Sequence, residues 1–307
     1  MQRESSTLTP PRLDTIVVAL AGFSAVLIVA IVLFILGDIT LGGMERLTWE
    51  FLSSEPRHGM TEGGIFPAIF GTFLLVIIMS IAGVPVGTVT AIYLAEYARE
   101  ESLVAKLIRF AVKTLAGVPA IVFGLFGLGF FIQFVGTGMD QALSGGETLK
   151  WGQPNILWAS LTMALLTLPV VIVSVEEALK AVPREIREAS YALGATRWQT
   201  IWRVVLPNSL TGILTGGILA VSRGAGEVAP ILFTGAAYFL PHLPSSLSDQ
   251  FMELGYHIYI MATQSVDVEA TKPLQYSTTL VLLLLIFALN FSAIFLRYRV
   301  RLRLQAA

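Results

Sequence analysis

The 307-residue sequence contains no cysteine, and only 13% of its residues are charged. The absence of cysteine excludes disulfide bonds, thiolate metal sites and a cysteine nucleophile, although it leaves the cellular compartment open. Apolar residues make up 55% of the chain, and its mean hydropathy is +0.74. Because a soluble domain of this length carries more charge, the composition indicates a protein that crosses a membrane several times.

Long apolar runs define the expected fold. A helix needs about 20 apolar residues to cross a hydrocarbon core of about 30 Å, and six runs meet this requirement. We therefore predict an all-α membrane protein with six transmembrane helices. The first run is long for a signal peptide and lacks a small-residue cleavage site, so we interpret it as a retained span. The expected spans lie at 16–36, 66–94, 108–135, 156–178, 209–231 and 276–297.

The basic residues are distributed unevenly between the two sides of these spans. If the N-terminus is inside, the inner segments carry fifteen of the twenty Lys and Arg residues and the outer loops carry four, with Arg223 inside the fifth span. Inner loops of membrane proteins are enriched in Lys and Arg. We therefore predict that both termini and the segment 180–208 face the cytoplasm.

Three expected spans contain an interior proline, namely Pro85, Pro119 and Pro169. Each proline frees a backbone carbonyl and bends its helix, which a bilayer tolerates only where neighbours or water satisfy that group. These spans either line a pathway or use their prolines to shape helix packing. The outer segment 235–275 is expected to lie on the membrane surface or to dip partly into it.

One pair of opposite charges, Arg223 and Glu227, lies within the fifth expected span. A lone arginine in the middle of a bilayer costs at least about 2.5 kcal/mol, and a carboxylate four residues away on the same helical face offsets part of that cost. Two interpretations follow. Arg223 offers its guanidinium group to an anion in a polar pathway while Glu227 orients it, or the two form a salt bridge that fixes the span to a neighbour.

No other residues form a recognisable catalytic or metal-binding pattern. The histidines (His58, His242 and His257) fall in outer loops without ligand spacing, and we expect them to be solvated or interfacial. Glu176 and Glu177 are adjacent rather than on one helical face, which favours an interfacial stop over an acid/base pair. The glycines around Arg223 lack the lysine of a phosphate-binding loop. We expect no enzyme activity, cofactor or metal in this chain.

The stretch from Pro183 to Pro207 is amphipathic and lies between two expected spans. Pro183 suits the first turn of a helix, and Gly194 falls where a left-handed cap would end it. Thr196 and Gln199 have the spacing of a capping box, which predicts a second short helix before Pro207. We expect a helix, a glycine corner and another helix at the membrane surface.

Within this stretch, Glu188-Ala189-Ser190, then Gly194 and then Val204-Val205-Leu206-Pro207 resemble the EAA loop of ABC importer permeases. The family pattern is E-A-A-x3-G-x9-I-x-L-P, so serine replaces one alanine and valine the isoleucine. The resemblance implies a type I importer permease of MetI-like architecture. It also implies that Glu188, Ala189 and Gly194 form a coupling helix that docks in a groove of a cytoplasmic ATPase.

Other segments narrow the resemblance to the PstA-type permease of phosphate ABC importers. These segments are Tyr93–Tyr97, Gly117–Gly124, Glu177–Pro183, Arg223–Pro230 and His257–Tyr259. The resemblance implies a permease subunit of the bacterial inner membrane that serves phosphate through Arg223 and Glu227. It also implies a PstC-type permease partner, PstB-type ATPase subunits that bind ATP, and an outer PstS-type phosphate-binding protein.

We expect three parts in the chain: a tail, span and outer loop at 1–65, a permease core at 66–297 and a basic tail at 298–307. Three alternatives remain at this stage. The chain could import another oxyanion such as sulfate or molybdate, act as a secondary transporter without an ATPase, or serve as a membrane scaffold that uses 183–207 for docking.

Overall fold

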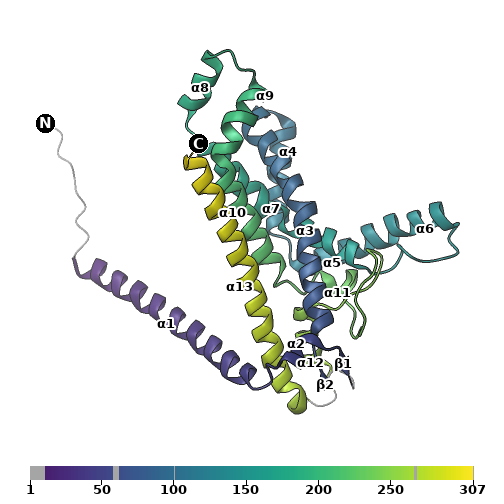
Figure 1. Cartoon of the computed structure of the whole chain (residues 1–307). Coiled ribbons are helices and arrows are strands. Elements are labelled where there is room, and N and C mark those ends of the chain that lie inside the picture. The colour runs from purple at the N-terminus through teal and green to yellow at the C-terminus, as the bar shows by residue number, and fades with distance from the viewer. Residues whose placement is uncertain (1–10, 58–61, 100, 266–267, 307) are drawn as a thin grey trace.

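The computed structural model describes residues 11–57, 62–99, 101–265 and 268–306, which form a mostly helical bundle (Figure 1). The first half of the chain contains α1 (Pro11–Met44), α2 (Trp49–Ser53), β1 (Pro56–Arg57), β2 (Glu62–Gly63), α3 (Phe66–Ile92), the π-helical turn η2 (Tyr93–Tyr97), α4 (Leu103–Ala116), α5 (Ala120–Phe126), η3 (Gly127–Gly136) and α6 (Thr137–Ser144). The second half contains α7 (Ile156–Lys180), α8 (Arg184–Ala192), α9 (Arg197–Thr200), η4 (Ile201–Val205), α10 (Leu206–Gly224), α11 (Ile231–Thr234), α12 (Leu254–Thr263) and α13 (Val268–Ala306).

Six helical segments within the described residues are long and apolar enough to cross a membrane, which matches the predicted number. They span 14–44, 66–97, 120–144, 156–180, 197–224 and 271–302. Figure 1 places α8, α9 and the end of α13 at one end of the bundle, and α2, α12 and the short β1–β2 hairpin at the other. The chain is therefore a multi-pass membrane protein.

The helix α7 forms the centre of the bundle and packs against α3 and α10. Two thirds of its most apolar stretch is buried within the chain itself, more than in any other of the six spans described. Glycines allow the close approach: a Cβ at Gly87 of α3 would overlap Val171, and a Cβ at Gly212 of α10 would overlap Ala178. Small residues at helix contacts bring backbones together in this way within membranes.

The third crossing differs from the expected continuous span at 108–135. The helix α4 ends at Ala116, and α5 begins at Ala120 after an extended Pro119, which is the N-cap residue of α5 and not an interior proline. Proline cannot donate a backbone hydrogen bond, and it disfavours helical geometry at the preceding residue, here Val118. Pro85 and Pro169, by contrast, lie inside α3 and α7 as predicted.

The fifth crossing begins earlier and ends earlier than the predicted 209–231. Residues 197–224 form one continuous helical segment through α9, η4 and α10, so Pro207 does not separate a surface helix from a span. The π-helical turn Ile201–Val205 precedes this proline, where the regular hydrogen-bond ladder cannot continue. At the other end, α10 stops at Gly224, before Pro230.

The outer segment that follows α11 is folded against the bundle. Phe251, Met252 and Leu254 are almost completely buried, and Thr72 of α3 accepts a hydrogen bond from the backbone N–H of Leu254. Residues 236–265 contain one helix, α12, which is not among the six spans. This segment closes the end of the bundle that lies opposite α8 (Figure 1).

The helix α1 stands apart from the other helices over most of its length (Figure 1). Its most apolar stretch has no buried residue, although it contacts α13 near its C-terminal end. There the Ser277 hydroxyl donates to the carbonyl of Gly43, and the Tyr276 hydroxyl donates to Asp38. The exposed face of α1 therefore faces lipid or another polypeptide.

Candidate functional site

The predicted first helix, the glycine corner and the capping box are confirmed, whereas the second helix is the start of the fifth span and not a short surface helix that ends before Pro207. The helix α8 ends at Ala192, and Gly194 follows with a φ of +83°, the left-handed conformation that favours glycine. Thr196 then caps α9: its hydroxyl accepts from the backbone N–H of Gln199 at 3.3 Å, and the Gln199 side chain accepts from the backbone N–H of Thr196 at 2.8 Å. This capping box fixes the direction in which the chain re-enters the bundle.

The helix α8 projects from the end of the bundle and has no buried residue. Glu188, Ala189 and Gly194 are all exposed, as are the apolar side chains of Ile186 and Leu193, the latter to 90%. An exposed amphipathic helix with an unpartnered apolar face is suited to binding in a groove of another protein.

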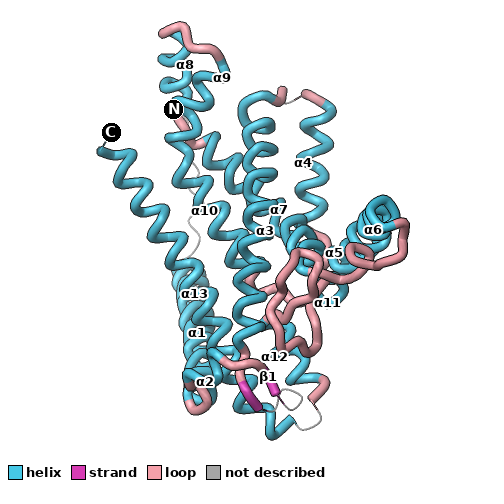
Figure 2. The backbone as a smooth tube through the Cα atoms, turned by 45° about the vertical axis from the view of Figure 1, so that its right-hand side comes forward, coloured by secondary structure: helices cyan, strands magenta, loops and turns pink. Residues whose placement is uncertain are grey.

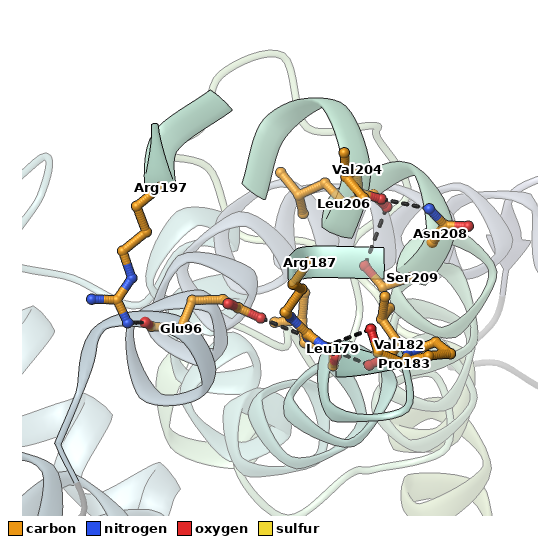
Figure 3. Close-up of polar contacts among 10 residues, drawn as sticks. All are labelled: Glu96, Leu179, Val182, Pro183, Arg187, Arg197, Val204, Leu206, Asn208 and Ser209. Atoms are coloured by element: carbon orange, nitrogen blue, oxygen red, sulfur yellow. Dashed lines mark hydrogen bonds and ion pairs between the residues drawn. The ribbon is translucent and has the colours of Figure 1, made fainter. Parts of the chain in front are cut away.

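A buried ion pair holds α8 against the bundle (Figure 3). Arg187 donates to the Glu96 carboxylate at 2.9 Å and to the carbonyl of Leu179 at 2.7 Å, and it also contacts the carbonyl of Val182. Glu96 lies in η2, at the end of α3, and its side chain is 8% exposed. The arginine therefore joins α8 to the ends of both α3 and α7.

A second arginine strengthens the same junction. Arg197, the first residue of α9, donates to the backbone carbonyl of Glu96, and its guanidinium group lies 5.1 Å from the centre of the Tyr97 ring. Both arms of the corner thus contact η2 (Figure 3). Sequence reasoning missed this junction because Glu96 and the two arginines are about ninety to a hundred residues apart in the chain, and only family resemblance singled out Tyr93–Tyr97.

Glu176 is more than the expected interfacial stop. It is buried and pairs with Arg109 of α4 and, at 2.7 Å, with Lys180 one turn further along α7, whereas Glu177 is exposed. Arg109 also donates to the carbonyl of Leu94 in η2 at 3.2 Å. The ion pair therefore fixes α4 to the same end of α7 that supports α8.

Arg223 and Glu227 lie at a break in the helical chain rather than on one face of a continuous helix. Arg223 is in the last turn of α10, and Glu227 follows in the non-helical segment 225–230. The Arg223 Nε and the Glu227 Oε1 are 3.9 Å apart, at the limit of an ion pair. The expectation of a shared helical face was wrong because α10 ends at Gly224, where a Cβ would overlap the Met79 side chain.

The Arg223 guanidinium group keeps most of its donors available. Within the described residues, neither terminal nitrogen has a hydrogen-bond partner, and neither Arg223 nor Glu227 pairs with a charge on another helix. The side chains are 40% and 29% exposed. The arrangement can present a guanidinium fork to an anion, which matches the chemistry of a phosphate or carboxylate group.

One continuous helical segment connects the corner at Gly194 with the break that follows Gly224. Residues 197–224 rise about 40 Å at 1.5 Å per residue, from the capped start of α9 to Arg223. The corner therefore leads directly into a helical segment, whose α-helical pattern is interrupted by the π-helical turn Ile201–Val205 and whose far end holds the arginine.

The histidines differ in environment. His257 lies in α12 and is 3% exposed, and its Nδ1 has no partner among the described residues, so the expectation of a solvated or interfacial side chain was wrong for it. It is buried because α12 packs into the bundle and not on its surface. His242 is exposed, and His58 lies outside the described residues. Within the described part of the chain, no group of three or more His, Asp or Glu side chains could hold a metal ion.

Comparisons with known proteins agree with this architecture. The family model of the binding-protein-dependent transport system inner membrane component matches residues 83–305. The probable ABC transporter permease protein YqgI of Bacillus subtilis is 31% identical over 271 residues, which cover 84% of this chain and 86% of YqgI.

Two phosphate transport system permease proteins named PstA are also similar. That of Mycobacterium leprae is 39% identical over 170 residues, 55% of this chain and 50% of that protein. That of Yersinia pestis is 38% identical over 202 residues, 66% of this chain and 59% of that protein. The chain thus spans about half of the length of these phosphate permeases.

Solved structures with the same fold are ABC transporters of low sequence identity. A bacterial alginate ABC transporter in complex with a pentasaccharide-bound periplasmic protein matches with a TM-score of 0.65 at 14% identity, over 92% of this chain and 93% of that one. The inward-facing MetNI methionine ABC transporter matches with a TM-score of 0.51 at 18% identity, over 77% and 94%. The six spans, the matched family model and these folds together place the chain in the family of binding-protein-dependent transport system inner membrane components, with the fold of a type I ABC importer permease.

Proposed function

We propose that this protein is the permease subunit of an ATP-driven importer of inorganic phosphate and forms half of its translocation pathway. The observation that carries the proposal is the exposed helix α8, which one continuous helix joins to the break at Arg223 and Glu227. Similarity to two PstA proteins, at 39% and 38% identity, supports phosphate as the substrate over sulfate or molybdate.

In this proposal, α8 is the coupling helix. Glu188, Ala189 and Gly194 contact a groove of a cytoplasmic ATPase subunit, as an amphipathic helix does in other helix-in-groove complexes. Closure of the ATPases moves α8, and Arg187 transmits that movement to α3 and α7 through Glu96 and the carbonyl of Leu179. Such closely packed helices switch between two arrangements rather than deform continuously.

In this proposal, Arg223 and Glu227 interact with the transported anion at the far end of the helical segment 197–224. Arg223 offers its unpaired terminal nitrogens to a phosphate oxygen, and Glu227, 3.9 Å away, limits the net charge when no anion is present. Phosphate itself is the transported substrate, so no bond is made or broken by this chain.

The proposal includes partners and a location. The permease pairs with a PstC-type subunit, two PstB-type ATPase subunits and an outer PstS-type binding protein. It lies in the bacterial inner membrane with both termini in the cytoplasm, which agrees with the excess of Lys and Arg on the α8 side. Residues 66–297 form the permease core, between an N-terminal part at 1–65 and a basic tail at 298–307.

Uptake by the reconstituted assembly tests this function. Proteoliposomes that contain all four kinds of subunit are expected to accumulate labelled phosphate only when ATP is supplied on the α8 side. An excess of unlabelled sulfate or molybdate, added without a binding protein for either anion, should not reduce the uptake of labelled phosphate. Phosphate uptake without ATP or without the ATPase would support a secondary transporter instead, and failure of the chain to retain any ATPase during purification would contradict the proposal.

Replacing Arg223 with glutamine tests the pathway separately. Because no described residue of another helix pairs with Arg223, the variant is expected to assemble normally. Uptake should fall at least tenfold, while Arg223→Lys, which keeps the charge but not the fork, should retain part of it. Assembly is measured by co-purification with the ATPase. A variant that fails to assemble would instead support a structural salt bridge.

A further inference from the structure

A basic hollow lies between α10 and α13, apart from both the surface corner and the chain break. Figure 2 shows that α13 diverges from α10 towards its C-terminal end. The hollow has a volume of about 360 Å³ and opens to the outside of the chain. Its lining consists of Thr211, Gly212, Thr215, Ile294, Arg297, Tyr298 and Arg301.

The two arginines of the hollow carry no countercharge, and one of them, Arg297, is held in place by a hydrogen bond. Arg297 and Arg301 are one turn apart on α13 and face the same hollow. Arg297 donates to the Thr215 hydroxyl at 3.0 Å, and that hydroxyl in turn donates to the carbonyl of Thr211 at 2.8 Å. Within the described residues, neither arginine forms an ion pair with a carboxylate, so two positive charges share this space without compensation.

The position of the hollow restricts what could neutralise it. Arg297 and Arg301 occupy the last turns of the membrane-spanning segment 271–302, at the end of the bundle that also holds α8. Ile294 supplies an apolar floor one turn deeper, and exposed Phe291 and Phe295 lie close to it in the chain. A basic hollow between two spans at this depth is level with lipid headgroups, and its apolar margin continues into the acyl region.

We propose that this hollow binds the phosphate group of an anionic phospholipid. The guanidinium groups of Arg297 and Arg301 hold the phosphodiester oxygens, the Tyr298 hydroxyl lies at the rim, and the acyl chains lie along α13 past Ile294. The Thr215 hydroxyl presets the direction of Arg297 before the lipid arrives. A bound lipid would fill the divergence of α10 and α13 and stabilise their spacing. The proposal rests on the membrane placement of α13, and not on phosphate as the transported substrate.

Native mass spectrometry of the full chain in detergent tests the site. Phosphatidylglycerol and phosphatidylcholine with identical acyl chains are the probes, and phosphatidylglycerol is expected to bind at least tenfold more tightly. The double variant Arg297→Gln, Arg301→Gln should weaken phosphatidylglycerol binding by about fivefold for each arginine removed, the usual effect of one basic residue near an anionic surface.

Two further variants separate the site from general surface charge and from misfolding. Arg299→Gln removes an arginine that lies 4.9 Å from the Phe295 ring and does not line the hollow, so it should leave lipid binding unchanged. Thr215→Val keeps both charges and the size of the side chain but no longer orients Arg297, so it should weaken binding about two- to threefold. This second variant decides the question if the double variant does not fold.

Three results would overturn the proposal. The first is equal binding of the two lipids, and the second is an equal loss of binding in Arg299→Gln and in the double variant. The third is displacement of phosphatidylglycerol by millimolar inorganic phosphate, because that would assign the hollow to a free anion. Phosphate uptake plays no part in these measurements, so a failure of the proposed transport function would leave their result intact.

Discussion

Backbone geometry, and not a close contact with a neighbouring atom, explains the glycine at position 194. Its φ is +83°, yet a Cβ built on it has no atom within 4 Å. A side chain would therefore cost conformational energy of about 1–2 kcal/mol without disturbing any contact inside the chain. The positive φ alone therefore accounts for glycine at this position, and the open space beside it leaves room for the docking partner that we propose.

Two substitutions at Gly194 separate backbone strain from docking. Asparagine tolerates the left-handed conformation better than most residues and is uncharged, whereas aspartate has nearly the same shape and adds a negative charge to the exposed corner. We expect Gly194→Asp to insert normally but to lose ATPase binding and uptake at least tenfold, and Gly194→Asn to retain more of both. Co-purification and uptake are the measurements. Full activity of the aspartate variant would contradict a docking role for the corner.

Glu253 and His257 are buried titratable residues of the outer segment, and burial shifts their pKa values in opposite directions. Burial raises the pKa of Glu253 to about 7, although its carboxylate accepts hydrogen bonds from the backbone N–H groups of Gly255 and Tyr256. Burial also lowers the pKa of His257 to about 4. The folded state therefore favours the neutral form of both side chains.

These shifts predict how stability depends on pH. Glu253 binds its proton more tightly in the folded state, so its contribution is complete below about pH 4.5 and is lost as the pH rises to about 7. His257 binds its proton less tightly in the folded state, so its contribution grows as the pH rises from about 4 to about 6.5. The two effects oppose each other over most of this range.

Replacing Glu253 with glutamine should therefore expose the contribution of His257 to the pH dependence of stability. Glutamine keeps one acceptor oxygen for the backbone N–H of either Gly255 or Tyr256, which donate to different oxygens of the Glu253 carboxylate, and it does not titrate. We expect the Tm of Glu253→Gln, measured in detergent, to rise with pH between about 4 and 6.5 more steeply than that of the unmodified protein. His257→Gln should show the opposite difference, a Tm that falls between about pH 4.5 and 7. Identical pH profiles for the three proteins would show that folding changes the pKa of neither residue, which would contradict the prediction.

At the scale of helices, glycines on α10 determine how closely it approaches its neighbours. A Cβ at Gly212 would overlap the Cβ of Ala178 on α7, whereas a Cβ at Gly217 would meet Val84 of α3 at 3.8 Å, an ordinary contact. Alanine is otherwise preferred over glycine inside a helix by up to about 1 kcal/mol. The same substitution at these two positions should therefore have opposite effects.

We predict that Gly212→Ala lowers the Tm of the purified chain by several degrees, because α7 and α10 must move apart. Gly217→Ala should leave the Tm unchanged or raise it slightly. Both variants replace a glycine of α10 with alanine, so a difference between their Tm values reports the contact with Ala178. If both variants are equally stable, close packing of α7 on α10 does not determine the spacing of the bundle.

Much of the helical layout could be predicted from the sequence, because apolar length alone fixes the number of spans. The corner at Gly194 and the capping box at Thr196 were also predictable, since each depends on residues a few positions apart. A continuous span with an interior Pro119 was predicted instead of the observed break, because a proline inside an apolar run is compatible with either a kinked or a divided helix. Hydropathy does not distinguish between the two.

The junction around Glu96 could not be predicted in the same way. Its ion pair with Arg187 joins residues on separate helices, and nothing in the local pattern of η2 indicates which arginine it binds. The early end of α10 could not be predicted for a similar reason. Gly224 and Pro230 allow a helix to end but do not require it, and the contact of Gly224 with Met79 is a property of the folded bundle.

At the scale of the whole molecule, the proposed function requires that α8 and the outer segment lie on opposite sides of the membrane. Figure 1 places them at opposite ends of the bundle, and the Lys and Arg distribution predicts that the α8 end is cytoplasmic. The lack of cysteine makes this assignment easy to test, because any introduced cysteine is the only reactive thiol in the chain.

Leu193 and Leu149 are suitable positions, since their side chains are 90% and 63% exposed and the two residues lie in loops that the predicted topology puts on opposite sides of the membrane. In right-side-out vesicles a membrane-impermeant maleimide should label Leu149→Cys but not Leu193→Cys, and in inverted vesicles the pattern should reverse. Co-expression of the ATPase should then reduce labelling of Leu193→Cys alone, because docking covers α8. The opposite sidedness would place the corner where no cytoplasmic ATPase can reach it and would contradict the proposed coupling.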